Sequence, residues 1–296
     1  MRIVQAVFGS LLIAAALPPT VALAAANLHQ EERVDLRLIT ALRDEALNRS
    51  QAQKTLGVLT DEIGPRLTGS PAFRHAAEWT QSQLSSWGLQ NVHAESFAPF
   101  GRSWTFDKAS LRMVAPLPLD IVAIPKAWTS GTHGVQRGKL VFAKLSSDEE
   151  LAKWKGKLAG RIVLLDEPAV IAPHLKGDAS RYSEQELSDL TKMDLGEAQS
   201  RHGDIAAYLK KLAFRKKLLG FLSEEKVLAV LNRTRGEDGT IFVQDGGSYK
   251  KGDPESPPDL VVMTETYDRL YRLVEKKKDV ELDVDVKADF GNEDPQ

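Results

Sequence analysis

From about residue 103 onward, the chain is built from short apolar segments bounded by proline, glycine and charged residues. Segments of this kind are typical of strands buried in a compact sheet or barrel. The clearest is the last, in which apolar residues from Val280 to Val286 alternate with charged ones. This alternation predicts a strand with one buried face and one face in water. The other segments cover residues 121–124, 140–142, 162–165, 241–243 and 260–263.

Helical patterns lie between these segments. One helix is expected to begin at Ser223, because Glu224 and Glu225 would then occupy its first turn, where carboxylates interact favourably with the helix dipole. A second helix carries an apolar face of Tyr267, Leu270, Tyr271 and Val274.

Residues 173–222 are polar and lack strand signals, which predicts a helical insertion. Its basic residues are interpreted as a solvated helix face, with a phosphate or anionic-lipid site as the alternative. These basic residues are Lys210, Lys211, Arg215, Lys216 and Lys217.

Before residue 103, the pattern predicts three helices followed by a strand at residues 92–97. Apolar residues at helical spacing define the first two helices, and the second ends at Gly64-Pro65. Ser70 is expected to cap the third helix, with Pro71 in the first helical position, where its missing N–H is tolerated. Gly88 closes that helix, because glycine readily adopts the left-handed conformation.

The N-terminus has the pattern of a secretory signal peptide. A short positive start precedes an apolar run over residues 3–17, a pair of prolines, and small residues that favour cleavage after Ala24 or Ala26. An uncleaved anchor is the alternative, although the apolar run is shorter than the ~20 residues that a membrane span needs. We therefore expect a secreted or periplasmic protein with no membrane span after cleavage.

Composition excludes several function classes. The formal net charge of −2 gives no basic face for nucleic acid, so no nucleic-acid partner is expected. The chain has no cysteine, which excludes disulfides, thiolate nucleophiles and cysteine-based zinc sites. No Gly-x-Ser-x-Gly nucleophile elbow, phosphate-binding loop or dinucleotide fingerprint occurs in the sequence.

Two segments together carry a family resemblance. Residues 64–70 read Gly-Pro-Arg-Leu-Thr-Gly-Ser between two helices, and residues 156–165 read Gly-Lys-Leu-Ala-Gly-Arg-Ile-Val-Leu-Leu in the β-rich part. This arrangement resembles the N-terminal half of peptidase family M28, in its carboxypeptidase Q-like subgroup, where a protease-associated domain interrupts the catalytic domain. The resemblance extends from about Glu31 to the C-terminus.

The resemblance implies the domain organisation. A signal peptide would occupy residues 1–25 and the front of an M28-like peptidase domain residues 27–103. A protease-associated domain with the helical insertion would follow at residues 104–288, and residues 289–296 would begin the return to the catalytic domain. The implied fold is mixed α/β, with an incomplete helical front layer whose apolar faces would lie open.

The resemblance also implies a pair of zinc ions in the complete family protein, held by histidines and carboxylates. We expect no metal site and no catalytic residue in this chain, because the zinc-binding half would begin where the chain ends. His202-Gly203-Asp204 has the spacing of a family ligand motif but follows no buried strand. The pairs Glu149-Glu150 and Glu224-Glu225 are interpreted as helix starts.

One residue is a candidate substrate contact. Arg66 lies in the 64–70 segment, which belongs to the catalytic domain in the related family, although a plain helix-to-helix turn explains most of the segment. Two functions stay open at this stage. The chain is either a fragment of an exported zinc exopeptidase that acts on peptides, inactive alone, or a stand-alone protein-interaction module that pairs with a separate catalytic chain.

Overall fold

The computed structural model describes residues 35–96, 100–168, 170–173, 175, 177, 179–192 and 205–291. The expected signal peptide and the His202-Gly203-Asp204 motif lie outside these residues. The chain divides into two compact units, residues 1–58 and 59–296, and each is described by itself.

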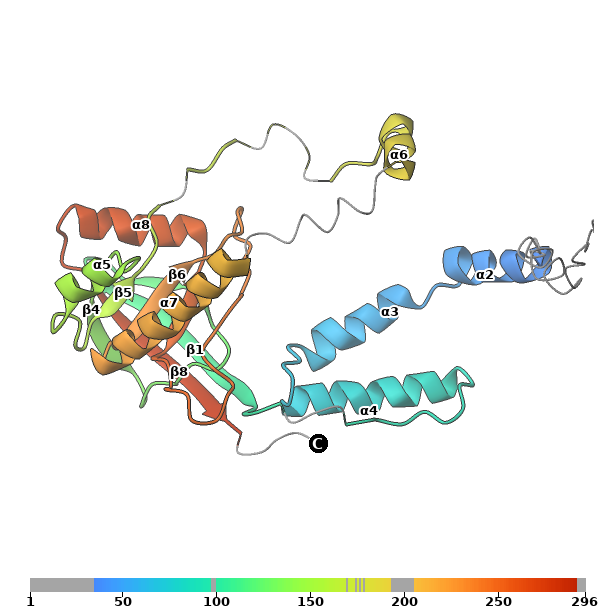
Figure 1. Ribbon diagram of the computed structural model, residues 1–296, viewed down its shortest axis with the longest axis horizontal. Coiled ribbons are helices and arrows are strands. Elements are labelled where there is room, and N and C mark those ends of the chain that lie inside the picture. The colour runs from blue at the N-terminus through green and yellow to red at the C-terminus, as the bar shows by residue number, and fades with distance from the viewer. Residues whose placement is uncertain are drawn as a thin grey trace, which may run out of the picture. The chain divides into compact units, whose positions relative to one another are not determined.

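The described part of the first unit, residues 35–58, contains two helices without buried side chains, α2 (Leu36–Asn48) and α3 (Ala52–Gly57) (Figure 1). The carboxylate of Asp35 caps α2 by accepting hydrogen bonds from the backbone N–H groups of Arg37 and Leu38. Several large apolar side chains on these helices are exposed, among them Leu36 at 73% and Leu47 at 74%. The expected open apolar faces are therefore present.

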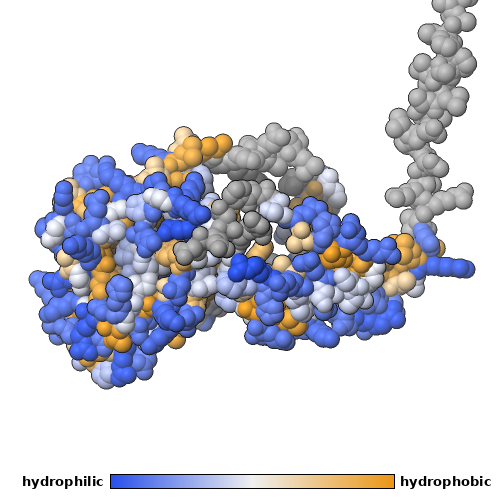
Figure 2. Space-filling view, turned by 90° about the horizontal axis from the view of Figure 1, so that it is seen from below, coloured by the Kyte–Doolittle hydropathy of each residue, from blue (hydrophilic) through white to orange (hydrophobic). Residues whose placement is uncertain are grey.

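The predicted second helix ends differently from a regular α-helix. Its last turn is the π-helical η2 (Val58–Ile63), which stops at Gly64, whose φ of 75° favours glycine. The third helix, α4 (Pro71–Ser86), confirms its predicted start, because the Ser70 hydroxyl accepts the backbone N–H of Phe73 at 3.1 Å. Gly88 ends the turn after it with a φ of 88°. Figure 2 shows apolar patches among the polar surface of the front helices.

The strand expected at residues 92–97 is not formed in its described part, residues 92–96. A strand needs a neighbour to satisfy its backbone hydrogen bonds. Within this segment, the His93 ring instead binds the Asn91 carbonyl at 2.7 Å and the Glu95 carboxylate at 2.8 Å. These two contacts raise the pKa of His93 above its ordinary value.

The β-rich part forms one eight-stranded sheet in the order β2-β1-β8-β4-β5-β6-β7-β3. The strands β4, β5, β6 and β7 pair in parallel, and the pairs that involve β1, β8 and β3 are antiparallel. The mixed α/β fold class is thereby confirmed. The strand bounds are β1 Trp104–Ala115, β2 Leu119–Ile121, β3 Ala123–Pro125, β4 Gln136–Phe142, β5 Ile162–Leu164, β6 Ala229–Arg233, β7 Asp259–Val262 and β8 Glu281–Phe290.

Helices cover both faces of the sheet (Figure 1). Helix α8 (Thr264–Glu275) packs on one face through the predicted Tyr267 and Leu270, and α5 (Asp148–Trp154) and α7 (Ile205–Glu224) pack on the other. Neighbouring residues of a strand face opposite cores, as Val163 does relative to Ile162 and Leu164. The short helix α6 (Glu184–Thr191) has no buried side chain.

The alternation predicted for the last strand is confirmed. In and beside β8, the four valine and leucine side chains of the predicted face are no more than 1% exposed. Charged side chains of the opposite face form ion pairs with neighbouring strands: Asp283 with Arg137 at 2.7 Å and Lys287 with Asp107 at 2.7 Å. This arrangement buries one face of β8 and leaves its charged face partly in water.

Two local predictions are wrong. Residues 241–243 form no strand, because the Phe242 N–H donates to the Thr234 hydroxyl at 2.9 Å rather than to a neighbouring strand. No helix begins at Ser223, since α7 ends at Glu224 and Lys226 adopts a left-handed φ of 54°. The C-terminal half of α7 packs into the core through Leu222, and the bounds of the predicted insertion stay a prediction.

Among the described residues, none of the helices combines the length and the apolar character needed to span a membrane.

Candidate functional site

Arg66 forms its hydrogen bonds within the turn in which it lies. Its guanidinium donates to the Leu59 carbonyl and, at 2.6 Å, to the Gly64 carbonyl. The Gly64 carbonyl follows the end of η2, and the Leu59 carbonyl also accepts the Gly64 N–H at 3.2 Å. The side chain is exposed and contributes to no described pocket. The geometry therefore explains Arg66 by the helix-to-helix turn, and its substrate contact stays a prediction.

The other acidic candidates among the described residues do not come together. Glu149 and Glu150 lie in the first turn of α5, as predicted, behind the Ser147 cap. Glu225 lies beyond the end of α7 and accepts the Gly156 N–H at 2.8 Å. In the described part of the chain, no three His, Asp or Glu side chains gather as a metal site would require, so these residues do not fit a zinc pair.

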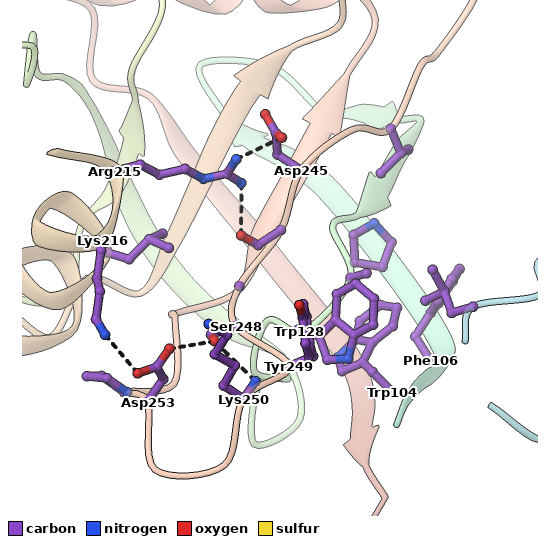
Figure 3. Close-up of a pocket in the computed structure, with 18 of the residues that line it drawn as sticks. Trp104, Phe106, Trp128, Arg215, Lys216, Asp245, Ser248, Tyr249, Lys250 and Asp253 are labelled. Atoms are coloured by element: carbon purple, nitrogen blue, oxygen red, sulfur yellow. Dashed lines mark hydrogen bonds and ion pairs between the residues drawn. The ribbon is translucent and has the colours of Figure 1, made fainter. Parts of the chain in front are cut away.

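A pocket of about 860 Å³ lies between β3, α7 and the loop of residues 243–254. Figure 3 shows aromatic rings along one side of it and ion pairs along the other. A volume of this size suits a small organic ligand, and such sites combine apolar walls with a few polar groups. The rings belong to Trp104, Phe106, Trp128 and Tyr249, Leu212 and Leu219 of α7 add apolar surface, and Pro65 and Leu67 also line the pocket.

The aromatic side of the pocket includes a residue with a strained backbone, Trp128. Trp128 holds a φ of 55°, a conformation that a bulky side chain rarely adopts, and its indole N–H donates to the Arg102 carbonyl at 2.9 Å. Gly247 passes so close to it that an added Cβ would lie 1.7 Å from the Trp128 carbonyl oxygen. Only glycine fits where the backbone of Gly247 passes the Trp128 carbonyl. Strained residues of this kind concentrate at ligand sites.

Two ion pairs form the polar side. Arg215 binds the Asp245 carboxylate at 2.8 Å and the Gly246 carbonyl at 2.9 Å. Lys216 binds the Asp253 carboxylate at 2.9 Å, and together with the Ser248 hydroxyl it holds the pKa of Asp253 below its ordinary value. Each pair places one cation and one anion beside the apolar space.

A buried carboxyl group, that of Asp259, lies at the start of β7. Asp259, at the start of β7, is 7% exposed and accepts a hydrogen bond of 2.5 Å from the Asn232 side chain. Burial raises its pKa, while Lys126 at 3.4 Å acts in the opposite direction. The carboxylate is thus a paired structural group that ties β7 to β6.

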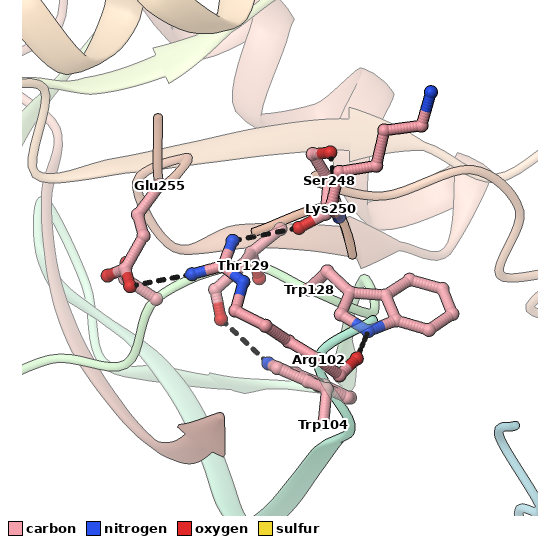
Figure 4. A network of polar contacts seen from close by, with 8 residues as sticks. Arg102, Trp104, Trp128, Thr129, Ser248, Lys250 and Glu255 are labelled. Carbon is pink, nitrogen blue, oxygen red and sulfur yellow. Dashed lines mark hydrogen bonds and ion pairs between the residues drawn. The ribbon is translucent and has the colours of Figure 1, made fainter. Parts of the chain in front are cut away.

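A polar network closes the end of the domain where the chain enters and leaves it (Figure 4). The Arg102 guanidinium donates to Glu255 at 3.0 Å and to the Ser248 carbonyl at 2.9 Å, and lies 4.3 Å from the ring centroid of Phe290. The Trp104 indole N–H donates to the Thr129 carbonyl at 2.8 Å. This network anchors the pocket loop beside the paired ends of β1 and β8.

Sequence patterns did not indicate this pocket. The basic residues Arg215 and Lys216 were expected on a solvated helix face, but both pair with the 243–254 loop. The one sequence signal was a pair of glycines next to serine and tyrosine at residues 246–249. Nothing in that signal names Trp104 or Trp128, which arrive from other strands and loops.

No family model matches the chain. Carboxypeptidase Q of Rattus norvegicus is 30% identical over 122 residues, which are 40% of this chain and 25% of that protein. Carboxypeptidase Q of Bos taurus is 31% identical over 126 residues, which are 42% of this chain and 25% of that protein. The match therefore spans about a quarter of the length of these relatives.

The fold has a solved counterpart. The crystal structure of a peptidase M28 precursor from Shewanella amazonensis aligns with a TM-score of 0.52 and 17% identity, over 86% of this chain and 50% of that chain. At this identity the likeness shows the fold alone. Together with the partial match to carboxypeptidase Q, it confirms the resemblance to M28 peptidases expected from the sequence.

Proposed function

We propose that this chain is the front part of an exported M28-type zinc exopeptidase and does not hydrolyse peptides by itself. The observation that carries the proposal is the double likeness to carboxypeptidase Q in sequence and to an M28 peptidase precursor in fold. The chain aligns with half of the M28 structure, so its share of the function is to complete and cover a catalytic domain rather than to perform the reaction.

The residues of this chain indicate which part of the complete enzyme's function they would supply. In the complete enzyme, two zinc ions would polarise the peptide carbonyl and supply a hydroxide nucleophile. The described residues of this chain supply no cluster for those ions. Its own contributions would be the helices α2, α3 and α4 and a protease-associated domain, with the aromatic pocket as one concave surface.

An activity assay tests this proposal. The purified chain, with zinc added, is expected to leave aminoacyl anilides and free dipeptides uncleaved, while an active zinc aminopeptidase in the same buffer cleaves them. Hydrolysis that is lost with a chelator and restored with zinc would contradict the proposal. Reading the coding DNA beyond the codon for Gln296 adds an independent check, since a continuing frame with a His-x-Asp motif would support it.

Export has its own test. Mass spectrometry of the protein recovered from the periplasm or the medium is expected to find Ala25 or Asn27 at the N-terminus, because small residues precede both positions. Recovery with an intact Met1 would contradict cleavage.

A second function is favoured by the pocket alone. A stand-alone interaction module would need a formed binding surface without a catalytic partner, and the strained, aromatic pocket is such a surface. A coding frame that stops at Gln296 beside an unrelated gene would favour this alternative.

A further inference from the structure

We propose that helix α6 docks on an exposed apolar face of α7 and thereby covers one wall of the pocket. The first half of α7, residues 205–213, consists only of exposed residues. Its large apolar side chains recur at the spacing of a single helix face and are 42–63% exposed. These side chains, the α7 stripe, belong to Ile205, Tyr208, Leu209 and Leu212.

The core of the domain cannot cover this stripe. The second half of α7 packs into the core through Leu218, Phe221 and Leu222, which lie on the other side of the helix from the stripe. Most of the stability of a helix in a protein comes from packing of its apolar face rather than from its own hydrogen bonds. The first half of α7 therefore gains stability from a partner that packs on the stripe.

Helix α6 has a matching apolar face. Leu187 and Leu190 lie about one turn apart, are 44% and 45% exposed, and belong to a helix that buries no side chain. The eight residues of α6 span about 12 Å, and residues 205–213 of α7 span about 13 Å. The two apolar faces can therefore pack against each other along the whole length of α6.

The charges beside these two faces have opposite signs. Residues 205–223 of α7 include lysine and arginine but no acidic residue. Arg215 and Lys216 turn towards the pocket loop and pair with its aspartates (Figure 3), whereas Lys210 and Lys211 are exposed and have no acidic partner among the described residues. Charges of opposite sign favour α6 over a second copy of α7, whose lysines would repel those of the first. The acidic residues of α6 are Glu184, Glu186 and Asp189.

Docking of α6 has a consequence for the pocket. Leu212 belongs to the stripe and also lines the pocket, so α6 packed on the stripe covers the wall that α7 contributes. Residues 192–204 keep the two helices within about 45 Å of each other even at full extension, so docking and release occur within one chain. Helix α6 is then a lid that controls access to the pocket from this side.

Cysteine pairs test the docking, because the chain has no cysteine of its own. Leu187→Cys with Leu209→Cys places one thiol on each apolar face, and mass spectrometry in a glutathione buffer measures the effective concentration of the two thiols. Leu187→Cys with Lys210→Cys is the matched control, because neighbouring residues of a helix point about 100° apart. We expect the first pair to have an effective concentration about tenfold higher than the second. Equal values for the two pairs would overturn the proposal.

A change of charge tests why α6 is the partner. Lys210→Glu with Lys211→Glu, added to the first cysteine pair, is expected to lower the effective concentration about fivefold, because the acidic residues of α6 then meet like charges. Lys276→Glu with Lys278→Glu, after the end of α8, is the control and is expected to leave it within about twofold. Equal effects of the two charge changes would contradict the match between α6 and α7.

Two further measurements cover the lid and the other partners that the stripe could have. The oxidised first pair is expected to bind the apolar dye anilinonaphthalene sulfonate about threefold more weakly than the reduced pair, and equal binding would contradict the lid. Leu209→Cys alone is expected to stay monomeric under oxidation, and the unmodified chain is expected not to sediment with vesicles of phosphatidylglycerol. Disulfide-linked dimers would identify a second copy on the stripe and sedimentation would identify a lipid surface, and either result would overturn the assignment of α6.

Discussion

At the scale of single residues, Arg66 is the candidate whose role the structure redefines. Its guanidinium holds the Leu59 and Gly64 carbonyls at the end of a π-helical turn. Arg66→Ala is expected to lower the free energy of unfolding of the front helices by about 1 kcal/mol, because two hydrogen bonds at an exposed site are lost. Hydrogen exchange of the amides of residues 58–70 measures this effect, and Arg66→Lys is expected to recover part of it. Unchanged exchange in Arg66→Ala would leave the substrate contact as the better explanation.

The ion pair of Asp283 with Arg137 predicts a pH dependence. Two hydrogen bonds, of 2.7 Å and 2.9 Å, hold the pKa of Asp283 below its ordinary value. A lowered pKa in the folded state stabilises the fold above the pKa of the unfolded chain, and that stabilisation is lost as the pH falls through the folded value. In Arg137→Ala, the pKa of Asp283 is expected to rise towards its ordinary value, and carbon NMR of the carboxyl group measures it. An unchanged pKa would show that the pair is not formed in solution.

At the scale of elements, the end of α7 gives the sharpest test. Glu225 accepts the Gly156 N–H with both carboxylate oxygens at 2.8 Å and thereby joins α7 to the turn before β5. Glu225→Ala is expected to cost about 1–2 kcal/mol in urea unfolding, because the Gly156 N–H and the part-buried Leu158 N–H, at 3.4 Å, both lose their acceptor. Glu224→Ala is the matched control, since that side chain is exposed, and a change below about 0.5 kcal/mol is expected. Equal losses of stability in the two variants would contradict a stabilising contact between Glu225 and Gly156.

The same region shows how far sequence patterns reach. The alternation in β8 and the apolar face of α8 were predicted because each repeats a period along the chain. The start of a helix at Ser223 was wrong because acidic residues there serve a contact with Gly156, which is distant in sequence. Strand β1 was missed because its pairing with β8 carries charged residues such as Asp107 and Lys108 on the wet face. The pocket was not predicted because its rings come from segments that are distant in sequence. These segments are β1, the loop after β3 and the 243–254 loop.

At the scale of the whole molecule, stability is divided unevenly along the chain. Both hydrophobic clusters consist of residues between Ala109 and Ala288. In contrast, α2 and α3 bury no side chain and α4 buries only Ala76. Each large apolar side chain left in water forgoes about 1.5–3 kcal/mol, and isolated helices of fewer than about 15 residues are marginal. The front helices therefore need a partner that the β-rich part does not need.

This division predicts that residues 100–291 fold without the front helices. We expect that fragment to unfold cooperatively within about 5 °C of the main transition of the whole chain, because it retains both clusters and the Arg102 network. A fragment of residues 35–96 is expected to show weak helical circular dichroism and rapid proteolysis, because almost none of its apolar surface is covered. Limited proteolysis of the whole chain should then cut first within residues 35–96 and leave the sheet intact. A cooperative transition in the isolated front fragment would contradict this prediction and show that α2–α4 stabilise one another.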